Sequence, residues 1–217
     1  MDIYMSIEII REPVPVIIFH DFFPPEINEK ILNEAIKNSE HFTESSIGDG
    51  KNKEYRNNLV CYYDNLYQQD RSKSFLLSAL DGKFRNDKDF REILSTCPYP
   101  ICDFLMTTKH ESQVSRYGDL EHYNWHQDRF ANTIRHITLV YYFHKEPKQW
   151  SGGEISFTDS PAYNGILVEK DPQIRTLIPE NNMAVVFSST ALHRVHQTRS
   201  PKDFASGRFS ANVWIGY

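Results

Sequence analysis

Two histidines and one aspartate are of the residue types that bind a metal ion together. His126 and Asp128 stand two residues apart, so on a β-strand their side chains leave the same face. His193 follows near the end of the chain. Two imidazoles and one carboxylate, around an ion whose other positions stay open, are typical of the facial triad of non-haem Fe(II) sites. The chain therefore contains a candidate iron site, although a His-x-Asp triplet alone often occurs on surface strands that bind no metal.

An arginine on a late strand adds a second chemical feature. In the run 208–214, Arg208, Ser210 and Asn212 alternate onto one face, and apolar residues take the other. An arginine inside a β-core is costly unless it meets an anion. Its planar guanidinium fits a carboxylate through two parallel hydrogen bonds. Arg208 is thus predicted to bind a carboxylate ligand beside the metal, and a surface salt bridge on an edge strand is the alternative.

The second half of the chain must position these residues, and it reads as short strands separated by turns. No long helix interrupts the strands, which favours an antiparallel sandwich or barrel. In a jelly roll the second and seventh strands are neighbours, so His193 is expected beside His126. The strand-like runs are residues 113–117, 123–128, 136–143, 154–157, 174–178, 183–187, 193–197 and 208–215.

The first half of the chain is mixed. Apolar spacing predicts helices over residues 26–38, 69–84 and 87–95, and β-like runs cover residues 14–19 and 58–63. No repeat or linker separates the halves. We therefore expect one domain over residues 1–217, with 1–110 as an N-terminal helical and β elaboration and 111–217 as a jelly-roll core. The predicted fold class is mainly β with flanking helices (α+β), around a double-stranded β-helix.

The amino-acid composition and charge argue against several classes of protein. The 217 residues carry a formal net charge of −5 without a clear Lys/Arg cluster, so a nucleic-acid partner is not expected. The three cysteines form no C-x-x-C pair and are typical of reduced thiols. The N-terminus has no signal-peptide pattern, and no apolar run is long enough to span a membrane. These features predict a cytoplasmic protein without membrane association.

Several motifs together resemble the 2-oxoglutarate/Fe(II)-dependent dioxygenases, in their prolyl 4-hydroxylase-like branch. The resemblance covers most of the chain and is closest in the last strand, up to Trp214. Upstream, the stretches 22–26 and 56–60 are also similar to the family's N-terminal segment. The matching stretches in the core are Ser115–Tyr117, His126–Asp128, Tyr141–Phe143, Trp150–Glu154, His193–Val195 and Arg208–Ser210.

The resemblance implies roles for individual residues. His126, Asp128 and His193 would bind Fe(II), and Arg208 would hold the distal carboxylate of 2-oxoglutarate with Tyr142. The remaining candidate cofactor-binding residues are Tyr117, Ser210, Asn212 and Trp214. For Tyr117, Asn212 and Trp214 a role as core side chains is an equal alternative.

Some neighbouring residues are expected to lie outside this site. His196 should face away from His193 or stand behind it, and His136 and His144 should be satisfied by local hydrogen bonds. Arg208 follows His193 by 15 residues, a longer gap than the family usually has, which leaves Arg199 as a minor competitor for the carboxylate. The loop 160–169, the segment 48–53 and the region near Arg129 are candidate specificity elements.

The implied activity is hydroxylation of an unactivated C–H bond, with 2-oxoglutarate and O2 as cosubstrates and release of succinate and CO2. Ascorbate is a further candidate cofactor. A prolyl-type residue in a peptide or protein is the leading substrate, and a free amino acid or another small molecule is the alternative. A Zn-dependent hydrolase and a non-catalytic β-sandwich binding module remain as other classes. The sequence gives no oligomeric state.

Overall fold

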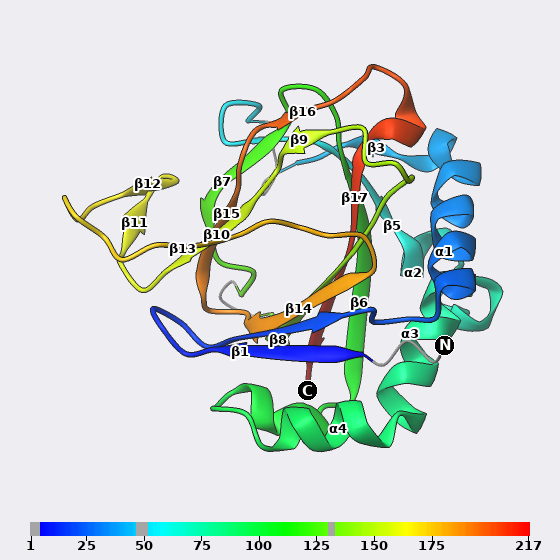
Figure 1. The fold of residues 1–217 in the computed structure, drawn as a ribbon, viewed down its shortest axis with the longest axis horizontal. Helices are drawn as coiled ribbons and strands as arrows, with labels where there is room; N and C mark the ends of the chain where they lie inside the picture. The colour runs from blue at the N-terminus through cyan, green and yellow to red at the C-terminus, as the bar shows by residue number, and fades with distance from the viewer. Residues whose placement is uncertain (1–4, 47–51, 130–132) are drawn as a thin grey trace.

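The computed structural model describes residues 5–46, 52–129 and 133–217. Two antiparallel sheets pack face to face, and helices cover the outer face of the larger sheet (Figure 1). The prediction of a mainly β jelly-roll core with flanking helices is confirmed.

The larger sheet has eight strands and forms the centre of the molecule. From one edge to the other these are β1 (Ser6–Ile10), β2 (Val16–His20), β14 (Met183–Ser188), β8 (Arg135–Phe143), β17 (Arg208–Gly216), β6 (Lys109–Tyr117), β5 (Leu59–Tyr62) and β3 (Thr43–Glu44). The last strand of the chain, β17, therefore lies in the middle of the sheet, paired with β8 on one side and β6 on the other.

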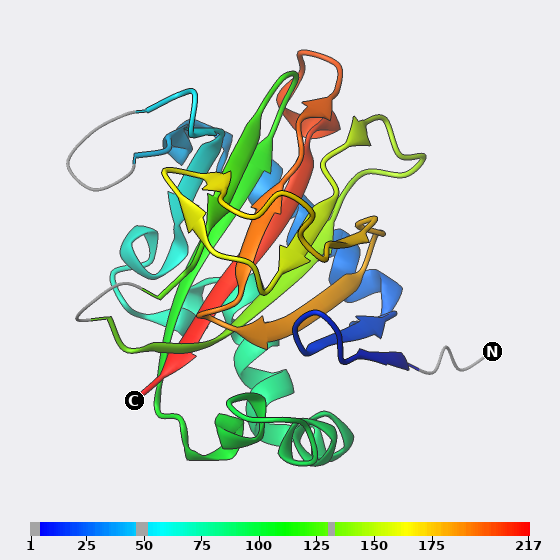
Figure 2. The same ribbon diagram turned by 90° about the vertical axis from the view of Figure 1, so that its left-hand side faces the viewer.

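The smaller sheet has five strands: β13 (Arg175–Leu177), β10 (Ile155–Thr158), β15 (Leu192–Val195), β7 (His122–His126) and β4 (Arg56–Asn57). Two short hairpin-like pairs complete the β-structure: β11 (Ala162–Tyr163) with β12 (Ile166–Leu167), and β9 (Ser151–Gly152) with β16 (Thr198–Arg199). The β11–β12 hairpin stands out from the body of the molecule, in front of β7 (Figure 2).

Four α-helices lie within the first half of the chain: α1 (Pro25–Lys37), α2 (Tyr63–Leu66), α3 (Phe75–Asn86) and α4 (Lys88–Ser95), followed by the 3-10 segment η3 (Ile101–Met106). The predicted helix over 69–84 starts later than expected. Gln68 and Gln69 have positive φ, and the Ser74 hydroxyl caps α3 by accepting from the Leu77 amide at 3.1 Å. The backbone before Ser74 is therefore a turn followed by the short 3-10 segment η2 (Arg71–Lys73), and the α-helix begins only at Phe75.

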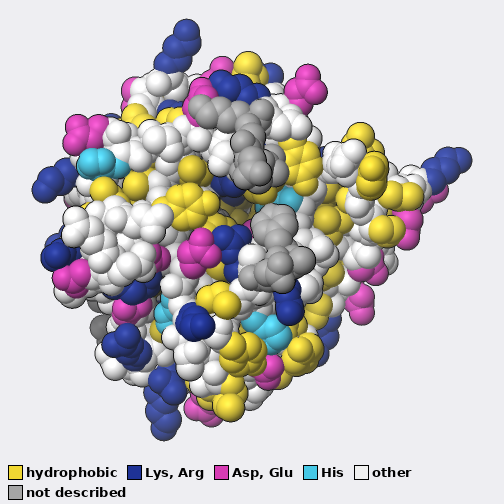
Figure 3. Space-filling model, turned by 180° about the vertical axis from the view of Figure 1, so that it is seen from behind, with side chains coloured by type: hydrophobic (Ala, Val, Ile, Leu, Met, Phe, Trp, Pro, Cys, Tyr) yellow, Lys and Arg dark blue, Asp and Glu magenta, His cyan; other side chains and the backbone are white. Residues whose placement is uncertain are grey.

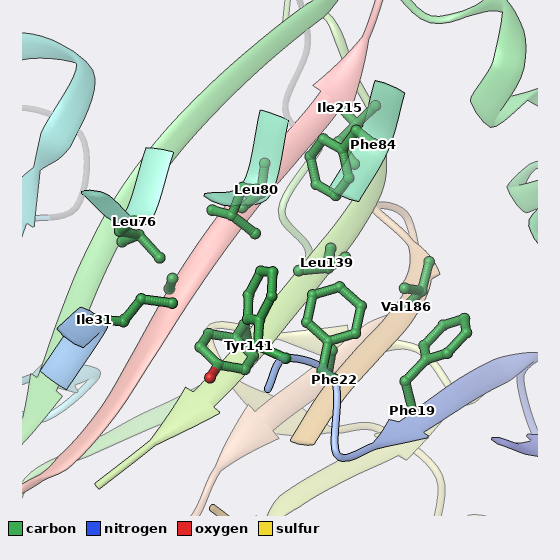
Figure 4. Packing of buried hydrophobic residues seen from close by; sticks show 14 of the residues in the cluster. Phe19, Phe22, Ile31, Leu76, Leu80, Phe84, Leu139, Tyr141, Val186 and Ile215 are labelled. Carbon is green, nitrogen blue, oxygen red and sulfur yellow. The ribbon is translucent and has the colours of Figure 1, made fainter. Parts of the chain in front are cut away.

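The main core lies between the helices and the larger sheet. Phe22 and Tyr141 pack at 5.6 Å between ring centroids, and Leu80 of α3 lies above them (Figure 4). A second core of apolar side chains fills the space between the two sheets, with Tyr142 and Phe157 at its centre. Each such side chain contributes roughly 1.5–3 kcal/mol by leaving water. The larger sheet is thus held on both faces, which makes its strands a rigid base.

β1 was not expected from the sequence. Its residues Ser6–Ile9 are exposed and only Ile10 is buried, so the apolar pattern of a core strand is missing. The strand exists because it pairs with β2, in the register Ser6↔His20 to Ile10↔Val16. Five strands that precede residue 63 extend the two sheets, and the expected division at residue 110 stays a prediction.

In the described part of the chain, no helix is long and apolar enough to cross a membrane. On the face drawn in Figure 3, basic and acidic side chains are interspersed and form no continuous basic patch. The cytoplasmic location stays a prediction.

Asn182 joins the end of β2 to the start of β14. Its side chain accepts from the Phe23 amide at 3.0 Å and from the Tyr141 hydroxyl at 3.0 Å, and donates to the Phe23 carbonyl at 2.6 Å. Asn182→Ala leaves buried groups unpaired and keeps a φ of 63° that alanine tolerates poorly. We expect a loss of about 2–4 kcal/mol in the free energy of unfolding, measured by urea denaturation.

Asn182→Gly is the matched control, because glycine adopts this φ without strain. It should lose about 1 kcal/mol less than the alanine variant. An alanine variant within about 0.5 kcal/mol of the wild type would show that these hydrogen bonds contribute little.

His110 should make the stability of the folded protein depend on pH. Burial against Phe84 is the main cause that lowers its pKa, and Arg71 adds to it. The unfolded chain takes up this proton below a pH of about 6.5, whereas the folded protein resists it. Stability should therefore fall as the pH drops below about 6.5, by up to about 1.4 kcal/mol per pH unit from this residue. His110→Gln should show a shallower decline between pH 7 and 5 in thermal unfolding, and an unchanged slope would contradict the assignment.

Candidate metal centre and its pocket

The three predicted ligand residues come together beside the smaller sheet, which supplies His126 and His193. β15 pairs with β7 so that His193 lies directly opposite His126, and their ring centroids are 4.2 Å apart. The Asp128 carboxylate lies 4.0 Å from Nε2 of His126 and 3.7 Å from Nε2 of His193. All three side chains are buried, and their ligand atoms lie within 4.8 Å of one another. These separations suit one divalent ion that contacts each atom at about 2 Å.

Local hydrogen bonds orient both imidazoles. Nδ1 of His126 lies 2.7 Å from the Asn124 carbonyl, and Nδ1 of His193 lies 2.9 Å from the Ala191 carbonyl. A carbonyl only accepts, so each Nδ1 carries the proton and each Nε2 presents its lone pair to the centre. The rings are therefore set as metal ligands before any ion is present.

Asp128 is held from a different direction. β7 ends at His126, and Asp128 follows in the turn, where its amide donates to the Ser189 carbonyl at 3.0 Å. The Thr138 hydroxyl donates to Oδ2 of Asp128 at 2.9 Å. The other carboxylate oxygen remains available to an ion. The strand alternation expected for His126 and Asp128 was thus wrong in detail, because the turn and not the strand aims the carboxylate.

The electrostatics favour neutral imidazole. Burial lowers the pKa of His126 well below its ordinary value, and the neighbouring His193 lowers it further. Tyr123 stacks on His126 with ring centroids 3.4 Å apart and shields it from water. Since only the neutral ring can ligate a metal, His126 is in its metal-binding form at neutral pH.

A cavity of about 510 Å³ opens beside the three residues, and Arg208 lies in its wall. The Arg208 side chain is 1% exposed, yet its Nε and Nη1 have no hydrogen-bond partner within the described ranges. Its guanidinium lies over the rings of Tyr117 and Tyr142, at 4.9 and 4.8 Å from their centroids. The Tyr142 hydroxyl also lacks a partner among the described residues. A buried cation and a buried hydroxyl with unused donors indicate a place for an anionic ligand.

The other predicted cofactor residues lie in the same wall. Ser210, Asn212 and Trp214 line the cavity, as the alternation along β17 predicted, and Tyr117, which the resemblance implied, lines it from β6. Gly153 permits this arrangement. Its φ is +66°, and a Cβ there would come within 2.7 Å of Cδ of Arg208.

Sequence reasoning did not assign several further residues of this cavity to the site. Arg56, Gln113, Tyr123 and Arg135 also line it. Arg135 stacks on Trp214 at 3.6 Å and pairs with Glu111. The position of Asn212 on β17 would have pointed to its partner Gln113 on β6, but only once the strand pairing was known. Arg56 carries no such signal, because its strand, β4, has only two residues and shows no alternation.

The residues expected outside the site do lie outside the cavity. His196 bonds to the Ser156 hydroxyl at 2.7 Å, and His136 lies 3.3 Å from an Asp103 oxygen. Nδ1 of His144 lies 3.1 Å from the Lys145 carbonyl, and Arg199 is exposed on β16. The candidate specificity segment 48–53 lies largely outside the described residues, and the loop 160–169 forms the β11–β12 hairpin.

A family model and one protein of known sequence are similar to this chain. Residues 112–216 match the family model of the 2OG-Fe(II) oxygenase superfamily. The chain is 32% identical over 200 residues to an uncharacterized PKHD-type hydroxylase of Synechocystis sp., covering 90% of this chain and 61% of that protein. The chain thus spans less than two thirds of that relative's length.

Solved structures share the fold. A prolyl-4-hydroxylase from Pseudomonas putida superposes with a TM-score of 0.64 at 16% identity, covering 93% of this chain and 92% of the other. A prolyl hydroxylase from Trichoplax adhaerens, solved with a hypoxia inducible factor peptide, gives a TM-score of 0.65 at 15% identity, covering 93% and 83%. At these identities the likeness concerns the fold.

The geometry predicts a divalent metal site that depends on Asp128. Free Fe(II) or Co(II) at 100 times its dissociation constant should stabilise the wild type by about 2.7 kcal/mol, and Asp128→Ala and His193→Ala should lose this gain. Anaerobic thermal unfolding with and without metal measures it. His196→Ala is the matched control and should keep the gain, since His196 lies away from the cavity. Equal stabilisation of the wild type and Asp128→Ala would exclude the site.

Proposed function

We propose that the chain belongs to the 2OG-Fe(II) oxygenase superfamily, whose family model matches residues 112–216, and that it is an Fe(II)- and 2-oxoglutarate-dependent dioxygenase that hydroxylates an unactivated C–H bond. The leading substrate is a prolyl-type residue of a peptide. The observation that carries this proposal is Arg208, a buried guanidinium with unused donors in the same cavity as His126, Asp128 and His193.

The donor set fits the cofactors that the family name gives. Two imidazoles and one carboxylate are a donor set that suits Fe(II). When bound, iron, 2-oxoglutarate and O2 supply the oxidising chemistry, which yields succinate, CO2 and a hydroxylated product. A Zn-dependent hydrolase or a non-catalytic binding module would leave Arg208 without a task.

The chain's own residues orient and shield these groups. The Arg208 fork would bind the distal carboxylate of 2-oxoglutarate, and the Tyr142 hydroxyl would donate to it. Thr138 fixes Asp128, and the carbonyls of Asn124 and Ala191 fix the imidazoles. The apolar layer between the sheets keeps water from this end of the cavity. These contacts pre-arrange the site on rigid strands.

A peptidyl substrate is supported by the named relatives: the Pseudomonas protein is a prolyl-4-hydroxylase, and the Trichoplax protein was solved with a peptide. One observation favours the alternative, a free amino acid or another small carboxylate. Arg56 lines the cavity and bonds to the side-chain oxygens of Asn58 and Gln113, at 2.9 and 3.0 Å, rather than to a carboxylate. Its charge is therefore available to a ligand.

The proposal predicts succinate formation from 2-oxoglutarate that requires Fe(II). Arg208→Lys keeps the charge but loses the parallel pair of hydrogen bonds, so the KM for 2-oxoglutarate should rise about 10- to 100-fold, the equivalent of about 1.5–3 kcal/mol. Succinate release and a one-oxygen mass gain in a peptide or amino-acid pool are the measurements. Arg199→Lys on the exposed β16 is the control and should match the wild type. Absence of iron-dependent succinate from the wild type would refute the proposal.

A further inference from the structure

The cavity of about 510 Å³ beside the metal centre, here called the metal cavity, has two ends along the larger sheet. Where β17 pairs with β6, Arg208 lies opposite Tyr117, and Asn212 lies opposite Gln113. The strands rise about 13 Å from the first of these pairs to the second. The proposed function assigns 2-oxoglutarate to the Arg208 end. The Gln113 end is therefore left for another ligand.

Arg56 lies at the Gln113 end and has no acidic partner. Its Nη2 donates to Oε1 of Gln113 at 3.0 Å, and its Nε donates to Oδ1 of Asn58 at 2.9 Å. Both acceptors are uncharged amides, and no carboxylate pairs with Arg56 within residues 5–46, 52–129 and 133–217. A guanidinium has five N–H donors, so several donors of Arg56 remain for a ligand.

Gln113 adds an unused donor at the same end. Its oxygen accepts from Arg56 and from the Ser115 hydroxyl, the latter at 3.3 Å, which fixes the orientation of the amide. Nε2 of Gln113 and Nε1 of Trp214 are buried and have no hydrogen-bond partner among the described residues. Trp214 is a diagonal neighbour of Gln113, because Asn212 is its direct partner. Buried donors without acceptors indicate a ligand that accepts hydrogen bonds.

The charges of the metal cavity leave Arg56 without compensation. Nε and Nη2 of Arg135 donate to the Glu111 carboxylate at 3.2 and 3.0 Å, so this pair is neutral. With the proposed cosubstrates bound, the charges of Fe(II), Asp128, Arg208 and the 2-oxoglutarate dianion cancel. Among the described residues that line the cavity, Arg56 then carries the charge that has no counterpart. A partly enclosed site strengthens the attraction of such a charge for an anion.

Arg56 also lies close to the metal centre. Its guanidinium carbon is 4.5 Å from the centroid of the Tyr123 ring, and this ring stacks on His126 with the centroids 3.4 Å apart. One aromatic ring therefore separates Arg56 from a metal ligand. A small anionic group held by Arg56 would keep the rest of its molecule beside the metal.

We propose that Arg56 and Gln113 bind a carboxylate of the substrate, so that the oxidised molecule is an anion. This inference rests on the proposed function and names its substrate class. A set of donors without acceptors disfavours a cationic group, and the planar guanidinium fits a carboxylate through parallel hydrogen bonds. The carboxylate belongs either to a free amino acid or to an acidic residue of a peptide, and the experiment below separates these two sources.

Three variants change this end of the cavity. Arg56→Gln removes the charge, and Arg56→Lys keeps it. Gln113→Glu preserves the shape and the contact with Arg56, but it supplies the counter-charge from within the protein and removes the amide donor. Gln113→Glu also keeps the test decisive if Arg56→Gln fails to fold, which thermal unfolding shows.

Arg194→Gln is the matched control. Arg194 is partly buried, like Arg56, and lies over another aromatic ring of β7, that of Trp125, at 5.0 Å. It does not line the metal cavity. Loss of an arginine that covers a β7 ring is thus common to both variants, and only Arg56→Gln removes a charge from the cavity.

The test uses two pairs of probe pools. The first pair is the standard amino acids and their α-amides. The second is N-acetylated, C-amidated pentapeptides with a central proline and either one Glu or one Gln at the same flanking position. Ligand-observed NMR on the protein loaded with Fe(II) and 2-oxoglutarate, under argon, gives the affinity for each component without turnover.

The wild type should prefer the carboxylate pool in at least one pair, by about 10- to 100-fold, as expected for hydrogen bonds to a charged group. A preference in the first pair identifies a free amino acid, and one in the second identifies an acidic peptide. Arg56→Gln and Gln113→Glu should lose the preference, Arg56→Lys should keep part of it, and Arg194→Gln should keep all of it.

Two results would overturn the inference. One is the lack of any preference of the wild type for carboxylate over amide in both pairs, which includes a lack of binding from all pools. The other is a preference that persists in Arg56→Gln and Gln113→Glu. Iron-dependent succinate formation by the wild type without any probe tests the proposed function separately. Its absence refutes that function, whereas its presence beside either result rejects only the carboxylate site.

Discussion

The antiparallel pairing of β7 with β15 is the contact on which the site depends. It sets His126 opposite His193 and brings together two segments that are far apart in sequence. A shift of one residue in this register would turn one imidazole to the outer face of the sheet. The ladder shifts by an irregularity between His193 and Val195, and beyond it Val195 pairs with Tyr123; both of these side chains are buried, which holds the pairing. Metal affinity is therefore a consequence of how these two strands pack.

The second requirement is the buried charge of Arg208, whose Nε and Nη1 have no hydrogen-bond partner among the described residues. A buried guanidinium without an acidic partner destabilises a core. Arg208 nevertheless lies on β17, in the middle of the larger sheet. Two tyrosine rings, Tyr117 and Tyr142, lessen it through cation–π contact. The arrangement is stable enough to persist because the helices and the opposite sheet bury both faces of this sheet. The stability of the rest of the fold thus offsets the cost of burying Arg208, whose donors can bind a ligand.

The two sheets also supply different residues to the site. The larger sheet supplies Tyr142 from β8, and Arg208 with the other cavity-lining residues of β17. The smaller sheet supplies the two histidines. The turn after β7 belongs to neither sheet. It supplies Asp128 to the metal cavity, and Gln127 and Arg129 to a second cavity, of about 730 Å³.

The sequence by itself determined the chemistry and the fold class. Residue types gave His126, Asp128, His193 and Arg208 as candidates, and strand alternation put Ser210, Asn212 and Trp214 on the Arg208 face, since alternation is a local property of the chain. It could not give β1, whose exposed residues have no core pattern, or Arg56 and Gln113, which reach the cavity only through β4 and β6. It placed Asp128 on a strand, although a hydrogen bond to Ser189 and another from Thr138 aim the carboxylate from a turn. Contacts between distant segments decide such features, because a side chain's direction beyond a strand end depends on the partners that surround it there. The cavity of about 730 Å³ is the clearest case, because segments far apart in the sequence form it and no single stretch contains it.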